Sequence, residues 1–170
     1  VSFLDSRLEL PARMVPLEAD LRSALWRLYE ANHEVSPRVV LSSRGKTPMA
    51  PESISRLARL ALDREGQTHV RLMDLRHDWI LRQLMDKDWA EVARISGVEK
   101  KNAPRSSAQV DEFKLWRVLQ AERGTPAGLA LWLTWQLGLQ AQEIISLTWD
   151  QVDFSKDALR FEDRELPLTN

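Results

Sequence analysis

Start and stop signals for α-helices recur along this chain of 170 residues and restrict it to a mainly helical fold. Thr125 followed by Pro126 is typical of the first turn of a helix, and the apolar pattern after it ends at Gly138, a residue favoured just beyond a helix. Similar signals, with apolar residues repeated at intervals of three and four, predict further helices over about residues 17–31, 51–65, 74–86, 88–96, 110–121 and 141–147.

Strand signals are few and short. A β-like pattern around a polar turn predicts a hairpin over residues 1–17, closed by Pro16. Further strands are expected at Val39–Leu41 and at Ala158–Phe161, the second after a turn at residues 155–157. The expected class is therefore mainly α (α+β) with short β-hairpins.

Composition excludes several kinds of chemistry. The chain has no Cys, and its three His residues, at positions 33, 69 and 77, are too scattered for zinc-ligand spacing. We therefore expect no metal site and no small-molecule cofactor. No apolar run is long enough to cross a bilayer, and the start shows neither a basic leader nor a small-residue cleavage site. A cytoplasmic protein with no membrane partner is the expectation.

The charge gives no overall attraction for nucleic acid, because the formal net charge is −1 and the pI is near 6.4. It is distributed unevenly. Residues 1–101 hold 17 basic against 15 acidic residues, or +2, and residues 102–170 hold 7 against 10, or −3. Only the first part is slightly basic. The polar, aperiodic stretch over residues 100–108 carries Pro104 and separates the two parts as a linker.

Residues 138–154 read Gly-Leu-Gln-Ala-Gln-Glu-Ile-Ile-Ser-Leu-Thr-Trp-Asp-Gln-Val-Asp-Phe. This run resembles the first signature box of the phage integrase, or tyrosine recombinase, catalytic domain, which reads Gly-Leu-Arg, two variable residues, Glu-Leu, and then Leu, a variable residue, Trp, Asp and a closing Asp. Residues 74–77, Asp-Leu-Arg-His, resemble the second box, His-Asp-Leu-Arg-His, and residues 40–49 resemble the strand and loop before it. The resemblance covers most of the chain and implies integrase-like helices with short β-hairpins.

The two boxes stand in the reverse of their usual order. Residues 1–101 correspond to the back half of an integrase-like catalytic domain, 102–108 to a linker and 109–170 to the front half. Either the halves come from two tandem copies, or the chain is a circular permutation of one domain. The similar segments 13–17 and 164–168 favour tandem copies, because a permuted domain would contain that element once.

The resemblance implies a reaction in which a tyrosine attacks a DNA phosphodiester while arginines clamp the phosphate. Gln140 stands at the position of the first arginine, Met73 at that of a histidine, and Val98 at that of a later histidine or tryptophan. Arg76 remains at the position of the second arginine. The only tyrosine, Tyr29, lies in an earlier helix and not after Gly97-Val98. We therefore expect no intact catalytic residue and no strand cleavage by this chain alone.

DNA is the ligand that the resemblance implies, and the residues expected to contact its phosphates are Arg76, His77, Arg44 and Lys46. Each has a structural interpretation as well: Arg76 as an ion-pair partner of Glu143 or Asp74, and His77 as a packed or capping side chain. A contiguous basic stripe would favour DNA binding; its members would be Arg38, Arg44, Lys46, Arg56 and Arg59.

Three functions remain open. The first is an inactive recombinase-like protein with a residual role in DNA binding, recombination or integration. The second is an assembly scaffold without nucleic acid. The third is a recombinase subunit completed by a tyrosine from another chain. We also expect the helix at Gln140 to dock beside the helix of Arg76, within the chain or between two chains as a domain-swapped dimer, with the swap slightly favoured.

Overall fold

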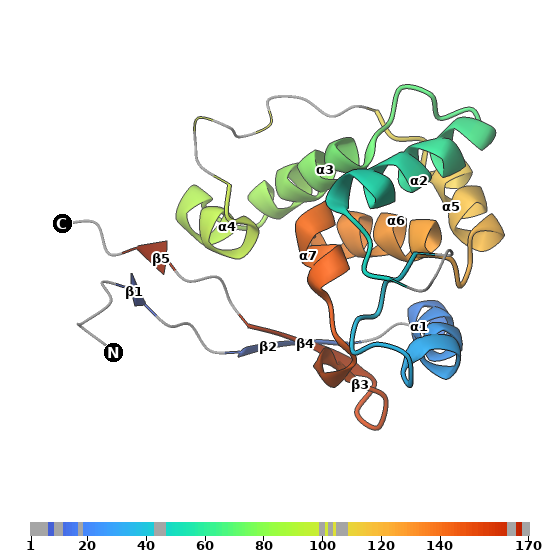
Figure 1. The fold of residues 1–170 in the computed structure, drawn as a ribbon. Coiled ribbons are helices and arrows are strands. Elements are labelled where there is room, and N and C mark those ends of the chain that lie inside the picture. The colour runs from blue at the N-terminus through green and yellow to red at the C-terminus, as the bar shows by residue number, and fades with distance from the viewer. Residues whose placement is uncertain are drawn as a thin grey trace.

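Helices make up most of the computed structural model, which describes residues 7–8, 12–16, 19–42, 47–98, 101, 104, 109–162 and 166–167 (Figure 1). The helices are α1 (Ala19–Asn32), α2 (Pro51–Arg64), α3 (Leu72–Leu84), α4 (Trp89–Ser96), α5 (Glu112–Ala121), α6 (Pro126–Leu137) and α7 (Ala141–Ser146). The strands are β1 (Arg7–Leu8), β2 (Ala12–Pro16), β3 (Val152–Asp153), β4 (Ala158–Glu162) and β5 (Leu166–Pro167). A mainly helical fold was predicted and is confirmed.

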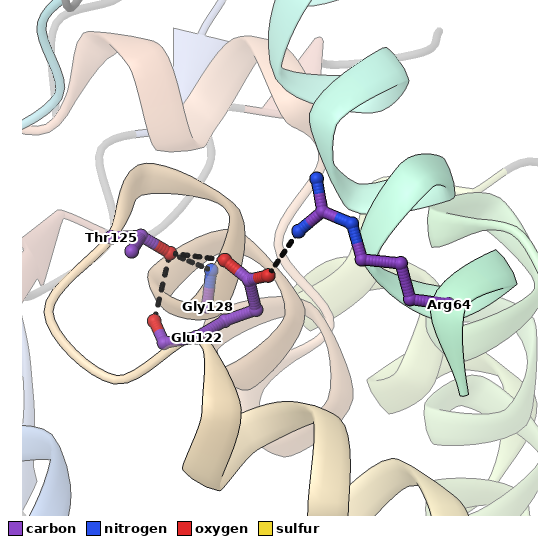
Figure 2. Close-up of polar contacts among 4 residues, drawn as sticks. All are labelled: Arg64, Glu122, Thr125 and Gly128. Carbon is purple, nitrogen blue, oxygen red and sulfur yellow. Dashed lines mark hydrogen bonds and ion pairs between the residues drawn. The ribbon is translucent and has the colours of Figure 1, made fainter.

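The expected caps form at the helix ends. The Thr125 hydroxyl oxygen accepts a hydrogen bond from the Gly128 amide at 3.1 Å, which satisfies one of the unpaired donors at the start of α6. The same hydroxyl lies 2.7 Å from the carbonyl oxygen and 3.0 Å from the carboxylate of Glu122, just beyond α5 (Figure 2). Arg64 at the end of α2 donates to that carboxylate at 2.8 Å. The start of α6 is thereby joined to the ends of α2 and α5.

Helix α6 is the centre of the packing. All eight residues from Ala127 to Thr134 are buried, as expected for a helix that is apolar on every side. It packs against α1, α2, α3 and α5, and α7 packs against α2 and α6. One hydrophobic core includes Leu25, Leu62 and Leu75 from the first part of the chain and Leu131 and Ile144 from the second. The segments before and after the linker therefore bury a shared core within one chain.

The short strands join the two ends of the described chain. Strands β2, β4 and β3 form an antiparallel sheet in the order β2-β4-β3, and β1 pairs with β5 (Figure 1). The prediction of a hairpin within residues 1–17 is therefore wrong for its described part, because β1 and β2 pair with C-terminal strands. A two-stranded hairpin is marginal in water, and β2 instead pairs with β4 as the third strand of a sheet. Val152 and the fully buried Leu159 attach this sheet to the core.

The turn between β3 and β4 is formed by an aspartate. The Asp153 carboxylate accepts from the Ser155 hydroxyl at 2.6 Å and from the Lys156 amide at 3.0 Å. These hydrogen bonds, the Ser155 one first, favour the charged carboxylate and lower the pKa of Asp153 below its usual value. The turn expected at residues 155–157 is confirmed, and it sets the antiparallel pairing of β3 with β4.

The expected strand at residues 39–41 does not form. Its backbone makes only isolated bridges, Arg38 with Thr148 and Leu41 with Pro48. Proline cannot donate to a ladder, so Pro48 on one side and Pro37 on the other prevent the pairing from extending. The segment instead is buried, and the Val39 amide donates to the Leu147 carbonyl at 3.0 Å.

None of the described helices combines the length and the apolar composition that a membrane crossing requires.

The left-handed turn at Gly138 permits a close approach of α6 and α3. Its φ is +67°, and a Cβ there would fall well inside the van der Waals radius of the Trp79 indole ring. We expect Gly138→Ala to lower the free energy of unfolding by about 2–4 kcal/mol, because left-handed strain and overpacking add. Gly66→Ala is the matched control: φ is +79°, but the nearest atom is Lys114 Nζ at 3.9 Å, so a loss of about 1–2 kcal/mol is expected. Equal losses in chemical denaturation would contradict the packing argument.

Candidate functional site

Three positions named in the recombinase resemblance line one small cavity. Met73 and Arg76 reach it from α3, and Gln140 reaches it from the start of α7. The cavity has a volume of about 70 Å³. Gln140 and Arg76 thus line one cavity within the chain, although α7 packs against α2 and α6. The exchange between two chains, which was slightly favoured, stays a prediction. Val98 is not part of this cavity, because it packs against a separate cluster of Trp79, Ile80 and Val92.

Arg76 is a buried backbone clamp. Only 2% of it is exposed, and its Nη1 donates to the Gly138 carbonyl at 2.6 Å while Nη2 donates to the Ser96 carbonyl at 2.7 Å. Carbonyls at helix C-termini lack partners within the helix and carry partial negative charge, so a guanidinium is well suited to them. Gly138 ends α6 and Ser96 ends α4. Arg76 therefore joins three helices through two charge-assisted hydrogen bonds.

The start of α3 differs slightly from the prediction. The helix begins at Leu72, and not at Asp74, because the Asp74 carboxylate accepts from the Arg71 amide at 2.7 Å and closes the first turn. This places Met73 inside that turn, with 55% of the residue exposed. A thioether cannot transfer a proton. The position therefore has no acid–base function.

Gln140 has an analogous place at the start of α7. The backbone amide of Gln140 donates to the Glu143 carboxylate at 3.2 Å, and the Gln140 side chain is exposed and uncharged. The cavity therefore has one cationic lining residue, Arg76, and two donors of that cation already bind carbonyls. No lining residue of this cavity is a histidine, lysine or tyrosine.

The remaining candidates lie elsewhere. His77 is half-buried on α3 and does not line the small cavity, and Arg44 and Lys46 lie outside the described residues. Tyr29 belongs to an aromatic cluster on α1. Its ring stacks on His33 with centroids 4.1 Å apart and meets Phe154 edge-on. Within the described ranges, no group of three or more His, Asp or Glu residues could hold a metal ion.

A larger groove beside the small cavity was missed by the sequence analysis. It has a volume of about 600 Å³ and lies between the N-terminal half of α2 and the first turn of α3. Arg56 and Arg59 line it from α2, and Arg71 lines it from the residue before α3. Its other lining residues are Pro51, Glu52, Ser55, Leu72 and Met73, of which the last three also line the small cavity. We call it the arginine groove.

The sequence held part of this signal. Arg56 and Arg59 are three residues apart, which places them on one helix face. Both side chains are exposed, and no acidic group among the described residues comes within ion-pair distance of either. Arg71 is less free, because its Nη1 lies 3.4 Å from the Asp63 carboxylate and donates to the Val70 carbonyl at 2.9 Å. The groove therefore has two available cations and a third that is shared.

Arg38, which was named with Arg56 and Arg59 as a member of a possible basic stripe, does not line the arginine groove. Arg38 is half-buried, and its Nη1 donates to the Ile145 carbonyl near the end of α7 at 2.8 Å. As with Arg76, the guanidinium donates to a carbonyl at the end of a helix. Arg71, which the sequence analysis did not single out, joins Arg56 and Arg59 instead.

Arg56 also lines a second hollow. This hollow, of about 790 Å³, lies between the first turns of α2 and α6 and includes Glu122 and Thr125. The Glu122 carboxylate there is bound by Arg64 and Thr125 (Figure 2). Because Arg64 forms an ion pair with Glu122, the Glu122 carboxylate does not cancel the positive potential that Arg56 contributes to both hollows.

The chain matches no protein-family model, no curated protein and no solved structure. The resemblance to tyrosine recombinases consequently depends on the two signature boxes and the segment before the second.

Arg76→Met should lower stability, because methionine fills similar space but donates to neither carbonyl. We expect a loss of about 2–4 kcal/mol in the free energy of unfolding, measured by chemical denaturation. Arg56→Ala, an exposed arginine on α2, is the control and should change stability by no more than about 0.5 kcal/mol. If Arg76→Met left stability unchanged but weakened phosphate binding, Arg76 would be a ligand-binding residue and not a clamp.

Proposed function

We propose that this chain is a catalytically inactive, tyrosine recombinase-like protein that binds DNA through the arginine groove. The observation that carries the proposal is the position of the groove. Arg56, Arg59 and Arg71 surround a hollow that opens next to the cavity of Met73 and Gln140. Cationic side chains thus remain beside the residues that stand at the family's catalytic positions.

The non-catalytic part of the proposal follows from the chemistry of the cavity. Gln140 brings no positive charge to a transition state that is doubly negative, and Met73 cannot act as an acid or base. Arg76 uses two donors to hold helix ends. The only tyrosine of the chain is part of an aromatic cluster on α1. The nucleophile, the proton donor and one phosphate clamp of the family's mechanism are therefore missing.

DNA binding is supported by the local charge and not by the net charge. Arg56 and Arg59 are exposed and without a described acidic partner, so they can bind a phosphate without first breaking an ion pair. Phosphate contacts release counterions from DNA, and this supplies most of the affinity of non-specific binding. Because the net charge is −1, that attraction has to come from local groups of cations such as the groove. A cytoplasmic location is part of the same proposal.

The strand pairing supports a permuted arrangement of one domain, whereas the similar segments 13–17 and 164–168 favour tandem copies. Strand β2, near the start of the chain, completes the sheet that β3 and β4 form near its end. Residues 1–101 and 109–170 then supply the back and front halves of a single integrase-like unit, with residues 102–108 between them. In a permuted domain, the segments near both termini belong to one antiparallel ribbon, as β1 and β5 do here.

One observation favours the alternative of an assembly scaffold. Phe113 and Trp116 on α5 are 70% and 48% exposed, and their spacing of three places them on one face. Aromatic residues are enriched at protein interfaces, so this face is suited to self-association or to another protein. The scaffold interpretation does not need the arginine groove, and the two functions can therefore be separated by substitutions in α2 and α5.

Removing both free arginines should weaken DNA binding and its dependence on salt. With a 20-base-pair duplex and fluorescence anisotropy between about 50 and 200 mM salt, Arg56→Ala with Arg59→Ala should reduce the log–log salt slope by about 2. Arg27→Ala with Arg117→Ala removes the same charge from exposed positions on α1 and α5 outside the groove, and should change the slope by less. No binding of duplex or single strand at the lower salt, or equal effects of the two pairs, would refute the groove as the DNA site.

A further inference from the structure

The arginine groove is an open hollow of about 600 Å³ whose lining is not only basic. Apolar groups from Pro51, Leu72 and Met73 line it together with the arginines. A surface that binds only the phosphate backbone of DNA needs no such apolar lining.

The bases of a DNA duplex cannot contact these apolar groups. The bases are stacked inside the helix, so a protein pocket receives a base only after the nucleotide has been unstacked, which costs a few kcal/mol per base. A single strand already exposes its base faces, and apolar and planar cationic side chains pack against them. Met73 is 55% exposed at the groove, and the exposed guanidinium groups of Arg56 and Arg59 can bind phosphates or stack on a base.

Glu52 adds a hydrogen-bond acceptor to the same surface. It precedes Arg56 by four residues on α2, so it lies on the same helix face as Arg56 and Arg59. Its carboxylate is exposed and lines the groove. A carboxylate accepts from the exocyclic amino group of cytosine, whereas thymine has no such group. The groove therefore combines phosphate-binding cations, an apolar contact for a base and an acceptor for an amino group.

From this combination we propose that the arginine groove binds single-stranded DNA in preference to duplex DNA, with an unstacked base against Met73 and a preference for cytosine over thymine. The inference rests on the proposed function and names its ligand. Met73, which replaces a proton-transferring residue in the resemblance, then has a binding role of its own. Its contact with a base is specific to the single strand, and the arginine contacts are shared by both forms of DNA.

The test compares 12-nucleotide oligo(dC), oligo(dT) and oligo(rC) with a 12-base-pair duplex by fluorescence anisotropy at low salt, with the full chain. Oligo(dC) should bind more tightly than the duplex, and Met73→Ala should weaken its binding by about fivefold or more while changing duplex binding by less than about twofold. Met85→Ala is the matched control, because Met85 is 84% exposed beyond α3 and does not line the groove. Glu52→Gln should reduce the difference between oligo(dC) and oligo(dT).

The possible outcomes distinguish failure of the proposed DNA-binding function from failure of the single-strand preference. If neither single strand nor duplex binds at low salt, the proposed function fails. If both bind equally and Met73→Ala changes neither, the groove binds DNA phosphates but the single-strand inference is wrong. If oligo(rC) binds more tightly than oligo(dC) with the same dependence on Met73, the assignment to DNA is overturned in favour of RNA.

Discussion

The fold depends on a buried guanidinium that binds two helix ends. Arg76 is 62 residues from Gly138 and 20 residues from Ser96 in sequence, and its donors reach both carbonyls at less than 3 Å. A buried arginine costs several kcal/mol unless its charge is well paired, and carbonyls at the ends of helices supply the pairing. The left-handed turn at Gly138 brings its carbonyl to this position and lets α6 approach Trp79 closely. Arg76 thereby connects α3 and α4 to the C-terminal part of the chain.

The same arrangement determines where positive charge is accessible in this region. Because Arg76 is used inside the fold, the small cavity beside it has no free cation, and the available positive charge lies on α2 next to it. Helix α2 holds this position because α6 and α7 pack against it and Arg64 binds Glu122 (Figure 2). Arg76 thus supports the fold beside the proposed binding surface, the arginine groove.

Local features of the fold could be predicted from the sequence, and distant pairings could not. The caps at Thr125 and Asp88 and the stop at Gly138 depend on residues within one turn, and all three form. The partner of β2 is about 150 residues away, so the strand pattern near the start could not identify it. The approach of Gln140 to Arg76 was predictable because two motifs indicated it. The arginine groove was not, because Arg56 and Arg71 meet only after α2 packs beside α3.

Two sets of arginines in one small region have different roles: Arg76 holds helix ends, and Arg56 and Arg59 are proposed to bind the ligand. NMR of the arginine Nε–Hε groups during a titration with single-stranded oligo(dC) separates these roles, because each guanidinium reports on its own environment. We expect the resonances of Arg56 and Arg59, both exposed in the groove, to shift with the oligonucleotide, while that of the buried Arg76 stays unchanged. A shift of Arg76 with Arg56 and Arg59 unchanged would disprove this division of roles and would return the binding site to the small cavity.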